Sequence, residues 1–289
     1  MRTHLILQGQ CIDNNALNYL AELSGAQEIE TLSKSIGCLQ DVQPEQVASH
    51  QTALAAFCAA QHLDYGLIPA ERRINQFKLL VMDMDSTLIA IECIDEIGDM
   101  LGIKPQISAI TEAAMRGEIE FAESLTRRLA LLAGLDALLL EQVYTQRVRL
   151  NPGAEQLISH ACASGIKTLL VSGGFTFFTE RLQAQLNLDY SAANTLEIIN
   201  GKLTGRVLGT ILDAQAKADW LTRTAGELNI APEQTVAIGD GANDLRMMAR
   251  AGISVAYHAK PVVQQQATYA LNFNGLDGVL ALLGDYLEV

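Results

Sequence analysis

The sequence predicts an α/β protein, in which a small N-terminal α+β unit precedes a parallel β-sheet flanked by helices. Three observations lead to this prediction. After residue 76, four short apolar runs alternate with helical patterns, and small or polar residues follow each run. More than eighty residues separate the first run from the second, far more than one crossover helix needs. A polar segment led by Pro69 precedes the first run and is typical of a linker.

The N-terminal unit spans residues 1–75. Strands are predicted at residues 3–7, 28–36 and, at the end of the unit, 65–68, and helices at 16–23 and 45–62. This βαββα-like order resembles the ACT fold, a small regulatory domain that binds amino acids. The resemblance implies an ACT-like domain, although the unit carries no ligand-binding motif. A structural or dimerising role is equally compatible with it, because an α+β layer with one exposed face often pairs with a second copy.

The second domain spans residues 76–289. Its parallel strands are predicted at residues 79–82, 168–171, 235–238 and 253–256, because β-branched and leucine-rich runs of this length suit strands buried on both faces. Residues 91–149 are predicted to form several helices. We therefore expect a helical cap of about residues 90–150, inserted after the first strand and lying over the carboxyl edge of the sheet. Asn200-Gly201 predicts a hairpin between strands at residues 197–199 and 202–204.

Composition and charge argue against several classes of function. The 289 residues are 49% hydrophobic and 18% charged, which is typical of a globular protein with a substantial core. The formal net charge of −13, without any basic stripe, argues against a nucleic-acid partner. The five cysteines form no C-x-x-C pair, so we expect neither a disulfide framework nor a zinc site, and a cytoplasmic location fits best. No apolar segment is long enough to predict a membrane span.

Polar side chains stand at the ends of the first two predicted parallel strands. Asp83 and Asp85 follow the run at residues 79–82, and open α/β sheets bind ligands at the carboxyl ends of parallel strands. An isolated pair of this kind is more often a helix cap or a strand end. Residues 172–174, Ser-Gly-Gly, follow the second strand. They offer a hydroxyl and free N–H groups at a helix N-terminus, which favour a phosphate oxygen.

The third strand is followed by residues 239–244, with the sequence GDGAND. The glycines permit a tight backbone, and Asp240, Asn243 and Asp244 offer the hard oxygen ligands that Mg²⁺ prefers. A helix cap would explain one of the aspartates but not the whole group. Lys217, at the start of a further predicted helix, would be a solvated surface residue if it stood alone. The net negative charge of the protein would repel a phosphorylated substrate, so cationic side chains close to the site must overcome this repulsion.

Taken in order, these motifs resemble those of the haloacid dehalogenase superfamily. The resemblance extends from residue 78 to the C-terminus and is carried by D-x-D-x-T at residues 83–87, S-G-G at 172–174, a lone lysine at 217 and G-D-G-x-N-D at 239–244. Glu92 and an insertion that contains Met115, Phe121 and Arg128 are similar to the phosphoserine phosphatase family of this superfamily. The resemblance implies a Rossmann-like parallel sheet of the haloacid dehalogenase type, with a helical cap inserted after the first strand.

The resemblance also implies an activity and a set of residue roles. The family hydrolyses O-phosphoserine to serine and phosphate through an aspartyl-phosphate intermediate, uses one Mg²⁺ per active site, and performs the last step of serine biosynthesis. By this resemblance Asp83 is the nucleophile and Asp85 the general acid and base, and the metal ligands are Asp83, Asp240 and the main-chain carbonyl of Asp85. The phosphate-binding residues are Ser172, Gly173, Lys217 and Asn243, of which Lys217 also neutralises charge in catalysis. The substrate-binding residues are Glu92, Met115, Phe121 and Arg128. The acid role requires a proton on Asp85 at neutral pH, so we expect neighbouring carboxylates to raise its pKa above that of Asp83.

Other interpretations stay open at this point. The chain could be a phosphatase or phosphotransferase for another small phosphomonoester, or a serine or phosphate sensor that lacks catalysis. On the insertion, Glu123, Arg127 and Arg128 also fit an exposed helix face with i, i+4 ion pairs. We expect a small-molecule substrate and no membrane or nucleic-acid partner, and a homodimer is compatible with the N-terminal unit.

Overall fold

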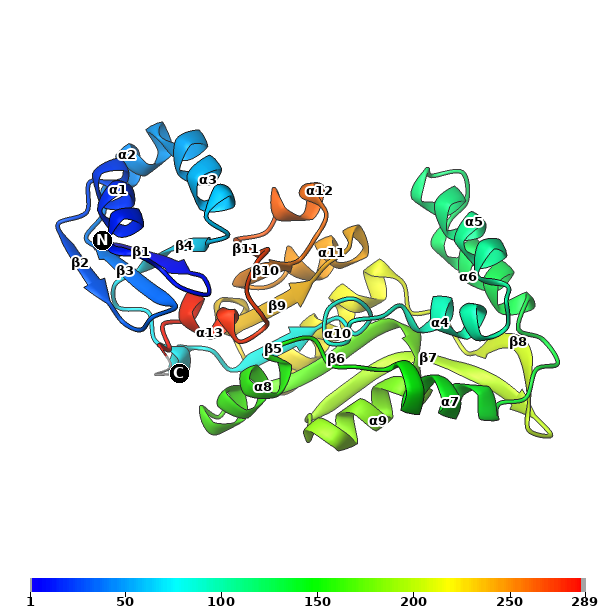
Figure 1. The fold of residues 1–289 in the computed structure, drawn as a ribbon. Coiled ribbons are helices and arrows are strands. Elements are labelled where there is room, and N and C mark those ends of the chain that lie inside the picture. Colours follow the sequence, from blue (N-terminus) through cyan, green and yellow to red (C-terminus); the bar gives the residue numbers. More distant parts are fainter. Residues whose placement is uncertain (1, 287–289) are drawn as a thin grey trace.

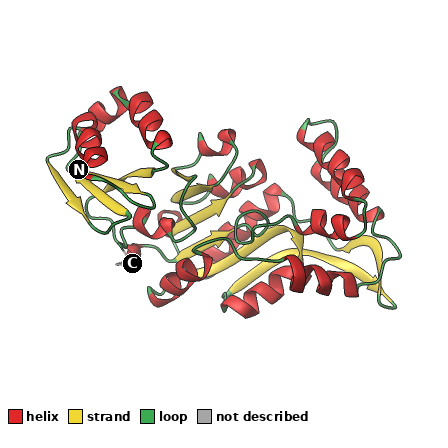
Figure 2. Ribbon diagram, in the orientation of Figure 1, coloured by secondary structure: helices red, strands yellow, loops and turns green. Residues whose placement is uncertain are grey.

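Two β-sheets organise the molecule, and they belong to separate stretches of the sequence (Figures 1 and 2). The computed structural model describes residues 2–286. The N-terminal sheet has four strands in the order β2-β3-β1-β4, and the larger sheet has seven in the order β11-β10-β9-β5-β6-β7-β8. The molecule is elongated, with the N-terminal unit at one end and the β7–β8 hairpin at the other (Figure 1). No helix among residues 2–286 is long and apolar enough to cross a membrane.

The N-terminal sheet is antiparallel and carries three helices. Its elements are β1 (Thr3–Gln8), α1 (Asn14–Ser24), β2 (Glu28–Thr31), β3 (Ile36–Gln40), α2 (Pro44–Ser49), α3 (Gln51–Ala60) and β4 (Asp64–Pro69). The prediction of one strand at residues 28–36 is wrong, because the chain reverses between β2 and β3. Ser33 causes the reversal: its hydroxyl accepts the N–H groups of Ser35 and Ile36. The helix predicted at residues 45–62 is two helices, α2 and α3.

Both faces of the N-terminal sheet are covered over β3, β1 and β4, while the edge strand β2 is exposed at all four positions. Leu5 and Leu7 of β1 pack with α1 and α3 on one face. Ile6, which points to the other face, packs with the apolar residues of helix α13 (Gly278–Leu282) at the far end of the sequence. Figure 1 shows α13 between the two sheets. The open face on which we based a dimerising role is therefore covered within the same chain.

A buried carboxylate links the N-terminal unit to the larger domain. Asp64, at the start of β4, is 2% exposed and accepts hydrogen bonds from the backbone N–H groups of Asn272, Phe273 and Asn274 at 2.7–3.0 Å. The side-chain amide of Asn274 donates a fourth hydrogen bond at 2.8 Å. Hydrogen bonds to an ionised acceptor are the strong ones, so this contact fixes the two units against each other.

The larger sheet is parallel except for its last strand, β8, which runs antiparallel to β7. Its strands are β5 (Leu79–Met82), β6 (Lys167–Phe175), β7 (Tyr190–Ile199), β8 (Lys202–Leu208), β9 (Thr235–Gly239), β10 (Ile253–Tyr257) and β11 (Tyr269–Leu271). The four predicted parallel strands and the hairpin at Asn200-Gly201 are confirmed. The full length of β7 and the short strand β11 were not predicted.

Helices cover both faces of this sheet, which explains why its central strand β5 is apolar at all four positions. On one face, Leu79 and Val81 pack with α10 (Ala214–Glu227), α11 (Leu245–Met248) and α12 (Pro261–Gln264). On the other, Leu80 and Met82 pack with α8 (Ala154–Ala163), α9 (Thr176–Leu186) and α13. Burial of these runs is the main driving force for the domain.

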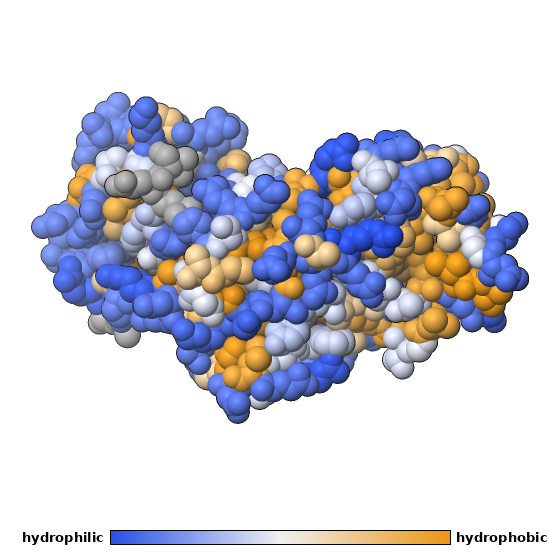
Figure 3. Space-filling view, turned by 90° about the horizontal axis from the view of Figure 1, so that it is seen from below, coloured by the Kyte–Doolittle hydropathy of each residue, from blue (hydrophilic) through white to orange (hydrophobic). Residues whose placement is uncertain are grey.

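Four helices lie between β5 and α8, in the segment where the sequence predicts several helices. They are α4 (Cys93–Met100), α5 (Lys104–Met115), α6 (Phe121–Ala130) and α7 (Leu138–Arg147), and we call them the inserted helices. They contact the β7–β8 hairpin, since the N–H groups of Gly134 and Ala137 donate to the carbonyls of Leu203 and Gly201. In Figure 3 apolar surface gathers toward the end of the molecule away from the N-terminal unit, and the exposed apolar residues include Ile198 and Leu208 of the hairpin.

Candidate functional site

The strand order of the larger sheet brings the predicted motifs together. β5 lies between β6 and β9, so the residues that follow these three parallel strands meet at one edge of the sheet. Asp83 follows β5 directly, and its N–H still donates to the carbonyl of Ile238 in β9 at 3.0 Å. Ser172 lies within the last part of β6, and Asp240 is the first residue after β9. The predicted convergence of the three segments is confirmed.

A buried ion-pair group forms the base of the site. The Nζ atom of Lys217 lies 2.7 Å from a carboxylate oxygen of Asp83 and 2.8 Å from one of Asp244. Lys217 is only 1% exposed, which excludes a solvated surface role. Burial by itself would lower the pKa of Lys217, but the charges of Asp244 and Asp83 outweigh it and raise the pKa. The lysine therefore stays protonated at neutral pH.

The position of Lys217 follows from the start of its helix. Asp213 is the N-cap of α10, and its carboxylate accepts the N–H of Ala216 at 2.9 Å. This fixes the first turn, so that Lys217 faces the sheet. Gly239 is needed nearby, because a Cβ at that position would collide with the carboxylate of Asp244.

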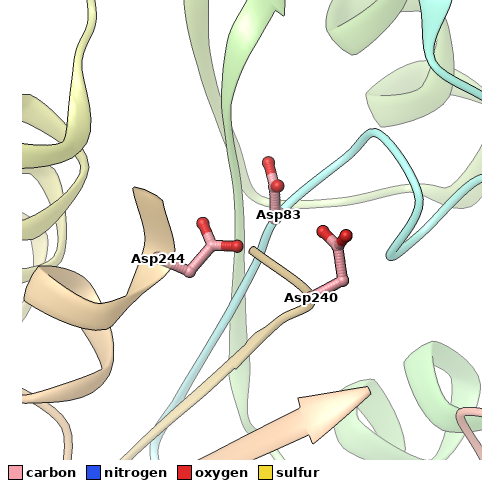
Figure 4. A group of neighbouring side chains, drawn as sticks. All are labelled: Asp83, Asp240 and Asp244. Carbon is pink, nitrogen blue, oxygen red and sulfur yellow. The ribbon is translucent and has the colours of Figure 1, made fainter. Parts of the chain in front are cut away.

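Three carboxylates meet at the same point. Asp83, Asp240 and Asp244 each present an oxygen within 4.8 Å of the others (Figure 4). Burial and the charge of Asp244 raise the pKa of Asp240 to about 6. Burial and Asp244 also raise the pKa of Asp83, and Lys217 acts in the opposite direction. Clustered carboxylate oxygens are ligands suited to a divalent cation, which would relieve their mutual repulsion. The carboxylate of Asp244 belongs to this group, whereas the carboxylate of Asp85 does not.

Asp85 lies beside this group in a different environment. Its carboxylate accepts the N–H of Cys93 at 3.0 Å. Burial, followed by the charge of Glu92, raises the pKa of Asp85 to about 7. At neutral pH this carboxyl holds a proton for part of the time, as an acid catalyst must. Gly174 makes room for it, because a Cβ there would lie 2.8 Å from the Asp85 carboxylate.

Hydrogen bonds from its own backbone and from Asn194 fix the Ser-Gly-Gly segment. The Ser172 hydroxyl accepts the N–H of Gly174 at 2.8 Å, and the carbonyl of Gly173 accepts the side-chain amide of Asn194 at 2.8 Å. The buried Asn194 also accepts the N–H of Leu212 at 2.7 Å, so it connects β7 to the segment before α10. Sequence reasoning missed Asn194, because nothing in its local pattern distinguishes it from other polar strand residues.

The inserted helices supply the opposite wall of the site. A cavity of about 380 Å³ separates them from the strand ends, and all eleven predicted site residues line it. Those on the strand-end side and on α10 are Asp83, Asp85, Ser172, Gly173, Lys217, Asp240 and Asn243, and those that precede or lie in the inserted helices are Glu92, Met115, Phe121 and Arg128.

The helical wall carries one acid and one base. Glu92 is exposed at the cavity and accepts the Ser86 hydroxyl at 2.7 Å. Arg128 donates only to the carbonyl of Ser124, at 3.4 Å, and makes no ion pair with any residue from 2 to 286. Arg127 pairs with Glu123 on the outer face of α6, so the alternative of an exposed i, i+4 pair applies to Arg127 and not to Arg128.

Sequence reasoning also missed two polar residues of the cavity wall. Ser124 is 1% exposed, and its hydroxyl has no hydrogen-bond partner in the described part of the chain. Lys260, the N-cap residue of α12, lines the cavity from the strand-end side. Neither belongs to a motif, and only the three-dimensional arrangement brings them to the site.

Comparison with known proteins agrees with this geometry. Residues 80–249 match the haloacid dehalogenase-like hydrolase family. The phosphoserine phosphatase of Polaromonas sp. is 53% identical over 216 residues, which cover 73% of this chain and 92% of that protein. The structure of a probable phosphoserine phosphatase from Vibrio cholerae is 37% identical with a TM-score of 0.83 and covers 98% of this chain and 86% of its own.

A further solved structure, a HAD family hydrolase from Salmonella enterica serovar Typhi, covers 99% of this chain and 100% of its own at 34% identity, with a TM-score of 0.89. These likenesses extend over both sheets. The chain therefore belongs to the haloacid dehalogenase-like hydrolases and, within them, to the phosphoserine phosphatase family.

Proposed function

We propose that this protein is a phosphatase that hydrolyses O-phosphoserine to serine and inorganic phosphate. One observation carries the proposal: the buried Asp83 and its partner Lys217 line a cavity whose far wall presents one acid and one base, Glu92 and Arg128, neither of which makes an ion pair with a described residue. Serine carries an ammonium and a carboxylate, and this wall is complementary to both. The names of its relatives support the same substrate.

Asp83 is the proposed nucleophile. Its carboxylate attacks the phosphorus atom, and the bond between phosphorus and the serine oxygen breaks, which leaves an aspartyl-phosphate. Asp85 donates its proton to the departing serine oxygen. It then accepts a proton from the water that attacks the aspartyl-phosphate, which releases phosphate and restores Asp83. The pKa of about 7 at Asp85 supports both directions of proton transfer.

A metal ion fits the carboxylate group. We propose one Mg²⁺, held by Asp83, Asp240 and the main-chain carbonyl of Asp85, with Asp244 close enough to take part or to orient Lys217. When bound, the ion would supply positive charge that offsets the negative charges of the phosphate and of Asp83. Ser172, the N–H of Gly173, Lys217 and Asn243 are the proposed protein contacts of the phosphate oxygens, and they surround the same end of the cavity.

The inserted helices are the proposed substrate-selecting cap, at about residues 90–150 of a catalytic domain at 76–289. Glu92 would bind the substrate ammonium and Arg128 its carboxylate, while Met115 and Phe121 would close the apolar side. Arg128 supports this role because it lies free of ion pairs beside the cavity.

We further propose that residues 1–75 form an ACT-like domain, and that the enzyme works in the cytoplasm in the last step of serine biosynthesis. The βαββαβ order and the strand order β2-β3-β1-β4 support the former. All five cysteines are free, as expected in a reducing compartment. A homodimer would have to use a surface other than the sheet face that α13 covers.

Phosphate release from a panel of substrates tests the proposal. The panel contains phosphoserine, other phospho-amino acids and sugar phosphates, each with Mg²⁺ and with EDTA. We expect the highest kcat/KM for phosphoserine and loss of turnover with EDTA. A stronger preference for a sugar phosphate would assign a different phosphomonoester, and the absence of any turnover with Mg²⁺ would favour a sensor.

A further inference from the structure

The cationic side chains that line the cavity differ in whether they already make ion pairs. Lys217, Arg128 and Lys260 line it, together with the carboxylates of Asp83 and Asp85 among others. Lys217 already makes two buried ion pairs, with Asp83 and Asp244. The proposed substrate brings a phosphate and a carboxylate into a protein of net charge −13. A cation without a partner at the entrance of such a cavity is therefore the residue most able to change substrate capture.

Lys260 is such a cation. Its side chain is exposed, and it makes no ion pair with any residue in the described part of the chain. Its Nζ atom makes a weak polar contact with the Sδ atom of Met115 on α5, at a distance of 3.8 Å. A thioether is a poor acceptor, so an anion that reaches Lys260 displaces it at little cost.

The backbone places Lys260 at the phosphate end of the cavity. The backbone N–H of Lys260 donates to the carbonyl of Asp240, with 3.4 Å between nitrogen and oxygen. This contact joins Lys260 to the loop that follows β9. Arg128 lies on α6, in the wall that we assign to the serine part of the substrate. The two free cations thus stand on different walls, and the phosphate is the group nearer to Lys260.

We propose that Lys260 captures the substrate phosphate at the entrance of the cavity, leaving Met115 as it does so. Nothing in the proposed catalytic steps uses Lys260. The inference rests on the proposed function only in that the substrate is a phosphate ester. Capture by a charge acts on kcat/KM and weakens as salt screens it, whereas loss of a catalytic contact lowers kcat at any salt concentration.

The test compares Lys260→Ala, Lys260→Arg and Lys260→Met with the matched control Lys202→Ala, an exposed lysine on β8 outside the cavity. Substrates are phosphoserine and p-nitrophenyl phosphate, with Mg²⁺ present. Salt is raised from about 0.01 M to about 1 M, which shortens the Debye length from about 30 Å to about 3 Å.

We expect Lys260→Ala and Lys260→Met to lower kcat/KM about tenfold for both substrates at low salt, with kcat nearly unchanged. The deficit should shrink at high salt, Lys260→Arg should retain most of the capture, and Lys202→Ala should match the parent protein. The methionine variant keeps an apolar contact with Met115 without the charge, so wild-type behaviour of this variant would overturn the inference. A deficit that is independent of salt, or confined to phosphoserine, would also overturn it.

Failure of the proposed substrate is distinguishable from failure of this inference. If the parent protein hydrolyses p-nitrophenyl phosphate but not phosphoserine, the substrate assignment fails while the role of Lys260 is still measured on the aryl ester. If both esters are hydrolysed and the Lys260 variants match the parent protein, only the role of Lys260 fails.

Discussion

The two walls of the cavity differ in how far they are organised without a ligand. On the strand-end wall, Asp83, Lys217 and Asp244 are buried and joined by contacts of 2.7–2.8 Å. On the helical wall, Met115 is 65% exposed and Arg128 has no ion pair among the described residues. Preorganised charge stabilises a transition state without reorganisation, whereas recognition can wait for substrate-induced closure. Under the roles proposed above, chemistry and substrate choice belong to separate walls of the cavity.

Loss of the acid on the strand-end wall should have the largest effect on rate. Asp85→Asn keeps the shape of the side chain but cannot protonate the serine oxygen, so we expect kcat to fall by about 10²–10⁴-fold. Binding of inorganic phosphate, measured by calorimetry, should stay close to that of the parent protein. Full activity in this variant would break the comparison, because the strand-end wall would then lack its assigned chemistry.

Removal of the central cation should damage both stability and rate. Lys217→Met leaves Asp83 and Asp244 buried without their partner, so we expect the free energy of unfolding to fall by about 3–5 kcal/mol. Denaturant unfolding measures it, and kcat should fall by at least about 10²-fold. The double variant Lys217→Met/Asp244→Asn should recover part of the stability but none of the activity. An unchanged unfolding midpoint in the single variant would show that the buried group is not preorganised.

Truncation on the helical wall should change specificity. In Arg128→Ala, loss of a charged hydrogen bond should raise KM for phosphoserine by about 10–100-fold, while KM for p-nitrophenyl phosphate changes little. Arg127→Ala is the matched control, because Arg127 lies on the outer face of α6 and pairs with Glu123. Steady-state kinetics on both esters measure the effect. Equal increases in KM for the two substrates would contradict a contact with the serine carboxylate.

A change far from both walls should leave activity nearly unchanged. Asp64→Ala removes the acceptor of four hydrogen bonds between the N-terminal unit and residues 272–274, and we expect a loss of at least about 3 kcal/mol of stability. Calorimetry should then resolve an earlier transition for the N-terminal unit, with kcat/KM within about twofold of the parent protein. A large loss of activity would show that the N-terminal unit supports the site.

The motif-bearing part of the site could be predicted because its signals are local. Asp83, Ser172 and Asp240 each follow an apolar strand, and parallel strands bring their carboxyl ends to one edge. Lys217 could not be predicted from its neighbourhood, since a lone lysine near a helix start usually faces solvent. The order of the motifs identified it, and the structure shows that it is buried.

Other features depend on contacts between distant residues, which one sequence does not display. Asn194 and Lys260 carry no pattern of their own, and the contact between Asp244 and Lys217 could not be inferred from the residues around either of them. In the N-terminal unit, the turn made by the Ser33 hydroxyl was hidden inside a run that otherwise suits a strand. The apolar run at residues 278–282 does not indicate which sheet it covers.

The placement of α13 has a consequence for synthesis on the ribosome. The N-terminal sheet is translated about two hundred residues before α13, the helix that packs on its second face. Many N-terminal domains complete their folding while the rest of the chain is still being made. Here the face of the nascent unit that carries Ile6 lacks its cover until α13 has been made. A chain arrested before residue 276 would be a natural client for chaperones that bind apolar strands.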